Sequence, residues 1–129
     1  MENSYVSHLE CSITGKKYEA NKIHGLSEAG RPLLVRYNLE KLKNEISREE
    51  ISNSKVDGLW RYSPLLPVAD PKNRISLGET ITPLIKLNKS VNYTNSDKGQ
   101  VLIKDEGRLP TGSFKARGLC LAVSMAKQF

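Results

Sequence analysis

A chain of 129 residues, of which 38% are apolar, can bury one modest core. The mean hydropathy of −0.46 and the lack of a long apolar run exclude a membrane-spanning helix. A formal charge of +6 would suit nucleic-acid binding, but the longest basic run is Lys16–Lys17 and no basic stripe is interleaved with aromatic residues. We therefore expect a solvated basic surface without a nucleic-acid or membrane partner. The sparing use of cysteine and the lack of a visible secretory signal predict a cytoplasmic location.

The first 37 residues are predicted to form a small β-rich module of short strands and turns. Residues 9–18 have the pattern of a small hairpin or knuckle, and residues 25–32 have that of a loop. Leu33–Tyr37 follows as a strand, because it is rich in apolar and aromatic residues.

Residues 38–83 are predicted to be helical at first and irregular afterwards. Asn38 is a suitable N-cap for a helix over Leu39–Ile46, in which leucine and isoleucine recur at helical spacing. Ser47–Glu50 has the form of a capping box, which predicts a short second helix that ends near Ser54.

A break at Asp57–Gly58 separates these helices from an aromatic, proline-punctuated stretch. Residues 59–68 are expected to form a packed, irregular segment with one helical turn. Two strands are predicted further on, at residues 84–87 and 100–104, with a polar loop over 88–99 between them. Such a pair is typical of a hairpin, although this loop is longer than usual.

A turn-rich loop then leads into a helix. Pro110–Gly112 cannot easily continue a strand or a helix, so the chain must turn there. Ser113 or Thr111 can cap the free amides of the helix that follows. Within residues 114–129, residues 119–123 and 125–126 are apolar almost all round, which predicts a helix buried inside a larger body. Cys120 within it is interpreted as a small buried hydrophobic residue.

Lys115 stands in the first turn of this helix, where a positive charge is unfavourable. The N-terminal end of a helix favours acids, so the helix dipole and any burial would disfavour the ammonium form. The neutral amine is the form that condenses with an aldehyde. From the residues alone two interpretations are open: a lysine that holds a cofactor, and a surface lysine at a helix start.

The stretch from Lys104 to Gly118 resembles the lysine loop of fold-type II pyridoxal-phosphate (PLP) enzymes. Its hexapeptide Pro-Thr-Gly-Ser-Phe-Lys, residues 110–115, is a specific signature, and in that family its lysine carries the cofactor. Further stretches occur in the same order as in the threonine synthase group and extend the resemblance over residues 8–127. They are Leu9–Lys16, Leu26–Tyr37, Leu59–Pro67 and Ser76–Leu84.

This resemblance implies an α/β fold of the tryptophan synthase β-like type, of which the chain would be the N-terminal part. Residues 1–37 would be a β-rich module similar to a degenerate zinc ribbon, and residues 38–83 a helical and irregular segment. Residues 84–129 would be the incomplete start of the PLP-binding α/β domain, with the hairpin and the lysine-loop helix.

The resemblance also implies an activity. The enzyme would be a PLP-dependent lyase that converts O-phospho-L-homoserine and water to L-threonine and phosphate. Lys115 would be catalytic and would hold PLP, with Ser113 and Phe114 beside it in the cofactor site. Lys104 and Thr111 would contact the substrate, and for Lys104 a structural surface lysine is an equally open interpretation. The partners implied are this small-molecule substrate and a second copy of the chain in a homodimer. Apart from the resemblance, we expect Arg117 to form a salt bridge, because it points to another side of the helix.

The chain departs from its relatives near Cys11. They often carry a Cys-x-x-Cys pair here and a later cysteine pair, but this chain has Thr14 where the second cysteine would be. One cysteine with His8 and His24 is a poor set for structural zinc, which needs four ligands. No metal is therefore expected, and both histidines are placed at the surface or in loops.

A glycine-rich loop for the cofactor phosphate does not occur in the sequence, so these residues are not expected to catalyse the reaction alone. Two further interpretations are open. The chain could belong to another fold-type II enzyme with the same loop, such as a cysteate synthase or a serine/threonine dehydratase. Alternatively, it could be a non-catalytic fragment, or a module that binds a partner through the apolar helix over 119–129.

Overall fold

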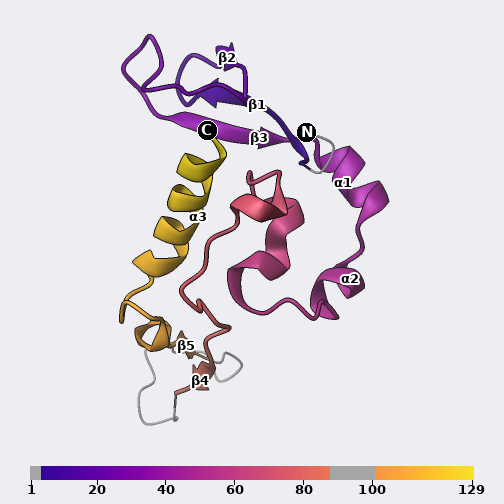
Figure 1. Cartoon of the computed structure of the whole chain (residues 1–129), viewed down its shortest axis with the longest axis vertical. Helices are drawn as coiled ribbons and strands as arrows, with labels where there is room; N and C mark the ends of the chain where they lie inside the picture. Colours follow the sequence, from indigo (N-terminus) through magenta and orange to yellow (C-terminus); the bar gives the residue numbers. More distant parts are fainter. Residues whose placement is uncertain (1–3, 88–100) are drawn as a thin grey trace.

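The amino end of the chain forms a three-stranded antiparallel sheet (Figure 1). The computed structural model describes residues 4–87 and 101–129. The strand order is β2-β1-β3, and Leu9 of β1 lies opposite Tyr18 of β2, which confirms the predicted hairpin. The three strands are β1 over Val6–Cys11, β2 over Lys17–Tyr18 and β3 over Leu33–Tyr37.

The central strand β1 also pairs with β3, with Leu9 opposite Val35. This pairing was not predicted from the sequence, because it requires the chain between the strands to fold back on the hairpin. His8 lies in β1 and is half-buried, with its Nε2 atom 3.6 Å from Oε2 of Glu10. His8 therefore lies in a strand and is partly exposed, whereas His24 lies in a loop as expected.

Two short helices follow the sheet, as predicted: α1 over Leu39–Glu45 and α2 over Arg48–Ser52. The Asn38 side chain accepts a hydrogen bond from the Lys41 amide at 2.9 Å. The Ser47 hydroxyl accepts from the Glu50 amide at 3.1 Å, and the Glu50 carboxylate accepts from the Ser47 amide at 2.7 Å. Both caps satisfy amides that the first turn leaves free, which fixes where each helix begins.

A 3-10 helix of eight residues, η1 over Gly58–Leu65, replaces the single helical turn that was expected. The Asp57 carboxylate starts it by accepting from the Gly58 amide at 2.8 Å. The backbone at Tyr62 is not helical, so η1 consists of two short pieces across a kink. A second 3-10 turn, η2 over Pro71–Asn73, was not predicted.

The core lies where η1 meets the last helix, α3, over Lys115–Gln128 (Figure 1). Trp60, Val68 and Cys120 are its buried members, and the Trp60 indole donates to the Ile75 carbonyl at 3.0 Å. Burial raises the pKa of the Cys120 thiol to about 11, as expected for a small buried residue that stays protonated. The residues packed around this centre are Leu59, Leu66, Leu121 and Met125.

Only one side of α3 is buried against the rest of the described chain. Ala116, Cys120 and Ser124 recur every four residues on that side and are at most 6% exposed. On the other side Leu119 is 59% exposed and Val123 is 50% exposed. The expectation of a helix buried all round is therefore not met within the described residues, because no other described element covers the outer apolar face.

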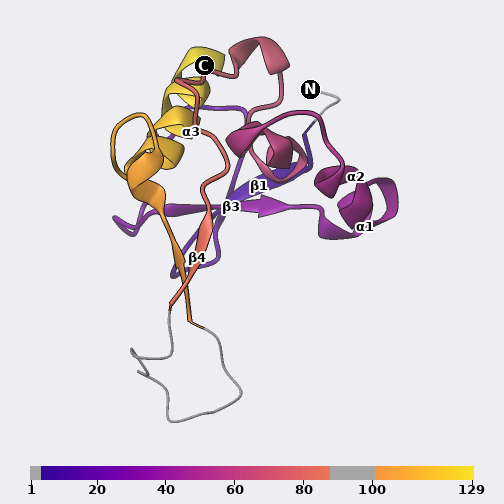
Figure 2. The same ribbon diagram turned by 90° about the horizontal axis from the view of Figure 1, so that it is seen from below.

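A two-stranded hairpin precedes α3. It consists of β4 over Leu84–Lys86 and β5 over Leu102–Lys104, with Ile85 opposite Ile103, and it confirms the predicted pair of strands. Figure 2 shows β4 and its partner extending away from the rest of the molecule. The predicted loop over 88–99 lies outside the described residues. Among the helices described, none is long and apolar enough to cross a membrane.

Candidate functional site

The predicted lysine loop connects β5 to α3 by a compact turn. It begins with a 3-10 turn, η3 over Glu106–Arg108, and continues with Leu109, which is only 3% exposed. Gly112 has a φ of +64° and donates its amide hydrogen to the Leu109 carbonyl at 2.7 Å. Glycine adopts this left-handed conformation without a steric cost, so the turn closes and the chain enters α3 at Lys115.

The start of α3 differs in detail from the prediction. Neither Ser113 nor Thr111 occupies the N-cap, because the backbone of Phe114 is already helical and takes that position. The Ser113 hydroxyl nevertheless accepts from the Lys115 amide at 3.3 Å and so satisfies one free donor of the first turn. The Thr111 hydroxyl donates to the Ser113 carbonyl at 3.3 Å and caps no amide.

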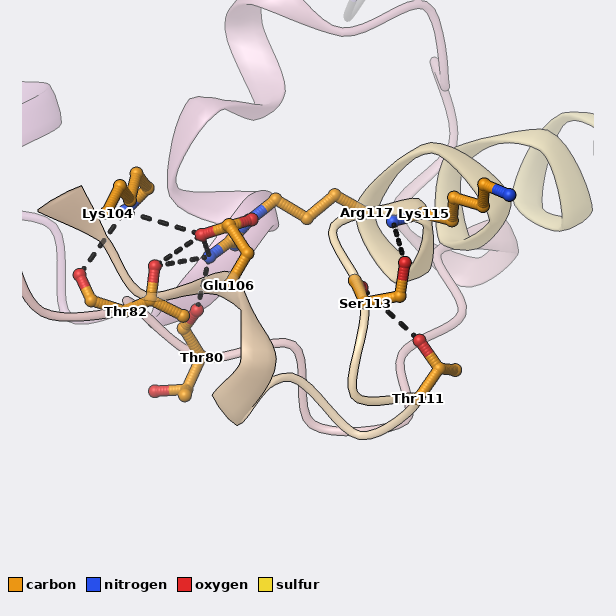
Figure 3. Close-up of polar contacts among 8 residues, drawn as sticks. All are labelled: Thr80, Thr82, Lys104, Glu106, Thr111, Ser113, Lys115 and Arg117. Carbon is orange, nitrogen blue, oxygen red and sulfur yellow. Dashed lines mark hydrogen bonds and ion pairs between the residues drawn. The ribbon is translucent and has the colours of Figure 1, made fainter.

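Lys115 is the first residue of α3, and its side chain is exposed. Figure 3 shows its amine pointing away from the polar side chains, which gather on the opposite side. Within residues 4–87 and 101–129, no hydrogen bond or ion pair engages this amine. Leu119 and Ala122, which follow on the same side of the helix, are exposed and uncharged. A primary amine thus stands at the head of an apolar helix face.

Glu106 and Arg117 form the main ion pair of the site, which confirms the predicted salt bridge of Arg117. Nε of Arg117 donates to Oε2 of Glu106 at 2.7 Å, and Nη2 donates to Oε1 at 3.1 Å. Each side chain is only 21% exposed. The hydrogen bond from Arg117, with another from the Thr82 hydroxyl, lowers the pKa of Glu106 to about 2. The same bond raises the pKa of Arg117.

Two further groups complete this cluster. Nη2 of Arg117 also donates to the Thr80 carbonyl at 2.9 Å, and Lys104 donates to the Thr82 carbonyl at 3.2 Å. The Lys104 amine lies 3.7 Å from Oε1 of Glu106. Figure 3 places the amines of Lys104 and Lys115 at opposite ends of the group, so the structure does not bring these two predicted site residues together.

The partners of Arg117 were missed by the sequence analysis. Glu106 lies eleven positions before Arg117, and Thr82 lies before the hairpin. The only sequence signal was the opposite charge at the two ends of the lysine loop. It was not used, because which acid meets the arginine depends on how the intervening turn closes.

A second polar site occupies the N-terminal knuckle. Cys11 is 1% exposed, and its sulfur accepts from the Thr14 amide at 3.5 Å and lies 3.1 Å from Oγ of Ser27. Hydrogen bonding with Ser27 and Thr14 lowers the pKa of the Cys11 thiol to about 6. In the part of the chain that the structure describes, no group of three or more histidine, cysteine or acidic side chains could hold a metal ion.

Known proteins similar to this chain are threonine synthases. The enzyme of Methanocaldococcus jannaschii is 35% identical over 118 residues, which are 92% of this chain and 28% of that enzyme. The enzyme of Methanosarcina acetivorans is 32% identical over 120 residues, again 92% of this chain and 28% of the relative. That of a Synechocystis species is 42% identical over 74 residues, or 54% of this chain. No protein-family model matches, and no solved structure matches.

The chain thus spans little more than a quarter of the length of its first relatives, while nearly all of it is matched. It resembles an N-terminal portion of threonine synthases, as the motifs of the sequence predicted.

Proposed function

We propose that this chain is the lysine-bearing N-terminal part of a PLP-dependent threonine synthase. Such an enzyme converts O-phospho-L-homoserine and water to L-threonine and phosphate. The observation that carries the proposal is the hexapeptide 110–115, which presents at the first residue of α3 an exposed amine with no partner among the described residues. The similarity to named threonine synthases over 92% of the chain supports it.

The residues of this chain fit the aldehyde end of PLP. Lys115 offers a primary amine on the open side of the helix, apart from the carboxylate of Glu106, which Arg117 neutralises. The exposed ring of Phe114 and the turn at Ser113 lie next to it in the chain. The sequence holds no glycine-rich phosphate loop, so we assign the cofactor phosphate to the portion of the polypeptide that corresponds to the rest of the relatives.

Each side chain of the loop would have a distinct part in the reaction. Bound PLP supplies an electron sink for a carbanion on the substrate. Neutral Lys115 would accept protons at Nζ from the α- and β-carbons in turn, since one lone pair carries one proton at a time. Ser113 would hold the first helical turn through the Lys115 amide. Thr111 and Lys104 are proposed to contact the substrate, and Lys104 would have to share its amine with Thr82.

The overall reaction also determines which groups and protons must be transferred. Phosphate leaves the γ-carbon, which gains hydrogen, and water adds its hydroxyl to the β-carbon. A base that both takes and returns protons is therefore required, and an amine that alternates between its neutral and charged forms meets this requirement.

The organisation of the protein follows from the same proposal. Residues 1–37 would be a β-rich module, residues 38–83 a connecting segment, and residues 84–129 the start of the tryptophan synthase β-like PLP-binding domain. We propose a cytoplasmic homodimer, in keeping with a biosynthetic enzyme that acts on a small, charged substrate.

Borohydride reduction in the presence of PLP, followed by peptide mapping, tests the assignment. In the complete natural polypeptide the label should appear on the peptide that contains Lys115. Lys115→Ala should lose the label and the release of phosphate from O-phosphohomoserine. Lys127→Ala, a change on the same helix whose side chain contacts the Lys72 carbonyl instead, should keep both. A label elsewhere in the wild-type protein would refute the role of Lys115, and faster turnover of O-phosphoserine would refute the substrate.

A further inference from the structure

The ion pair of Glu106 and Arg117 closes the loop that carries the lysine. Glu106 precedes the turn at Gly112 and Arg117 follows it, eleven positions later along the chain. Two hydrogen bonds, of 2.7 and 3.1 Å, link the carboxylate to the guanidinium in a bidentate pair. A bidentate pair fixes orientation as well as distance, so it holds both ends of the loop in one arrangement.

The same guanidinium ties the loop to a third segment. It donates to the Thr80 carbonyl at 2.9 Å and to the Thr82 hydroxyl at 3.3 Å, both in the chain that leads into β4. The Thr82 hydroxyl donates in turn to Glu106, which joins the segments into one network (Figure 3). Thr82 is only 2% exposed, so water competes little for these hydrogen bonds.

Helix geometry turns this network into a constraint on Lys115. Successive residues of an α-helix are about 100° apart around the axis, so two residues separated by two positions point to nearly opposite sides. Arg117 is bonded on the inner side, while the Lys115 amine leaves on the outer side (Figure 3). A rotation of the first turn would break the bonds of Arg117 and swing the amine away from its position.

We propose that Glu106 and Arg117 are positioning residues that set the direction of the Lys115 amine toward the aldehyde of its cofactor. The proposal rests on the function assigned above. Because the pair lies on the far side of the helix, it acts through the helix turn and does not touch the cofactor.

The test separates covalent capture from binding. In the complete natural polypeptide, Glu106→Gln, Arg117→Gln and the double variant are compared with the wild type. The rate constant for covalent capture of PLP at Lys115 is measured at saturating PLP by reduction and mapping. Affinity is measured with pyridoxine phosphate, which has the same phosphate and ring but no aldehyde. Arg108→Gln is the matched control, because Arg108 is in the same loop and, within residues 4–87 and 101–129, forms its ion pair with Asp105 alone, at 2.8 Å.

Each variant of the pair should slow capture by about tenfold to a hundredfold, the cost of a reacting group misplaced by about 1 Å. Its affinity for pyridoxine phosphate should stay unchanged. The double variant should be no slower than the slower single variant, because each single change already breaks the ion pair that the two residues share. Arg108→Gln should behave as the wild type, and Arg117→Lys, which keeps a cation, should recover part of the rate.

Unchanged capture in the variants would overturn the proposal. So would a parallel loss of capture and of pyridoxine phosphate affinity, which would show that the pair only supports the fold. If the wild type itself does not capture PLP at Lys115, the assigned function fails first, and that result is distinct from a failure of the positioning role alone.

Discussion

Gly58 offers a sharp test of how the segments around the site are packed. Its φ is +66°, and a β-carbon added there would lie 1.7 Å from the Glu79 carbonyl oxygen and 2.9 Å from the carbonyl carbon. Both contacts are with backbone, so no side-chain rotation can relieve them. Gly58→Ala must therefore push one backbone segment away from the other by more than an ångström.

The cost has two parts. A left-handed conformation costs an L-residue about 1–2 kcal/mol, and forcing extra atoms into a packed contact costs about 1–3 kcal/mol more. We expect Gly58→Ala to lower the free energy of unfolding by about 2–5 kcal/mol. Gly15→Ala is the matched control, because Gly15 has a φ of +70° but nothing within 4 Å of the added carbon. It should lose only the conformational part, about 1–2 kcal/mol.

Thermal and urea unfolding measure this difference. The melting temperature should fall by about 6–30 °C in Gly58→Ala and by about 3–12 °C in Gly15→Ala, at about 3–6 °C per kcal/mol for a chain of this size. Gly58→Ala should also slow PLP capture, because Glu79 immediately precedes Thr80, whose carbonyl accepts from Arg117. Equal losses in the two variants would refute the close approach of Gly58 to Glu79.

Three further predictions concern buried or paired groups. Ser124 is 0% exposed, and its hydroxyl accepts from the Ile75 amide at 2.9 Å. Ser124→Ala should therefore lower the free energy of unfolding in urea by about 1–3 kcal/mol. Ser52→Ala, a change at an exposed serine, should lower it little. The pKa of the Cys11 thiol is lowered from 9.0 to about 6, so between these pH values the thiol is protonated in the unfolded chain only. The free energy of unfolding should therefore rise with pH across that interval. Urea unfolding of Cys11→Ala at a series of pH values should lack this rise. The pKa of Glu106, lowered from 4.5 to about 2, contributes stability that is present above pH 4.5 and lost as pH falls toward 2. Glu106→Gln should therefore show a shallower acid limb in the same titration.

Features that depend on neighbours in the chain were predictable. Asn38 and Ser47 cap their helices through amides three residues away, so the sequence alone contains both partners of each bond. The turn at Gly112 was predictable for the same reason, since proline and glycine restrict the chain wherever they occur. The similarity to the threonine synthases was predicted from specific sequence motifs, and not from helix caps or turns.

Contacts between distant segments were not predictable. The pairing of β1 with β3 brings together residues such as Leu9 and Val35, and no local pattern selects that register. The half-buried state of His8 follows from this pairing. Likewise, no local pattern shows that the indole of the core residue Trp60 donates to the Ile75 carbonyl, which lies fifteen residues further on.

The position of Arg117 relative to Lys115 combines both kinds of information. A separation of two residues is visible in the sequence and places the side chains on opposite sides of any helix. What the structure adds is that one side is occupied by Glu106 and the other by exposed, uncharged residues such as Leu119. Had the arginine followed three or four residues after the lysine, its charge would share the outer face with the amine and repel a protonated Lys115. The observed spacing instead places the anchored Arg117 side chain and the Lys115 amine on different sides of α3.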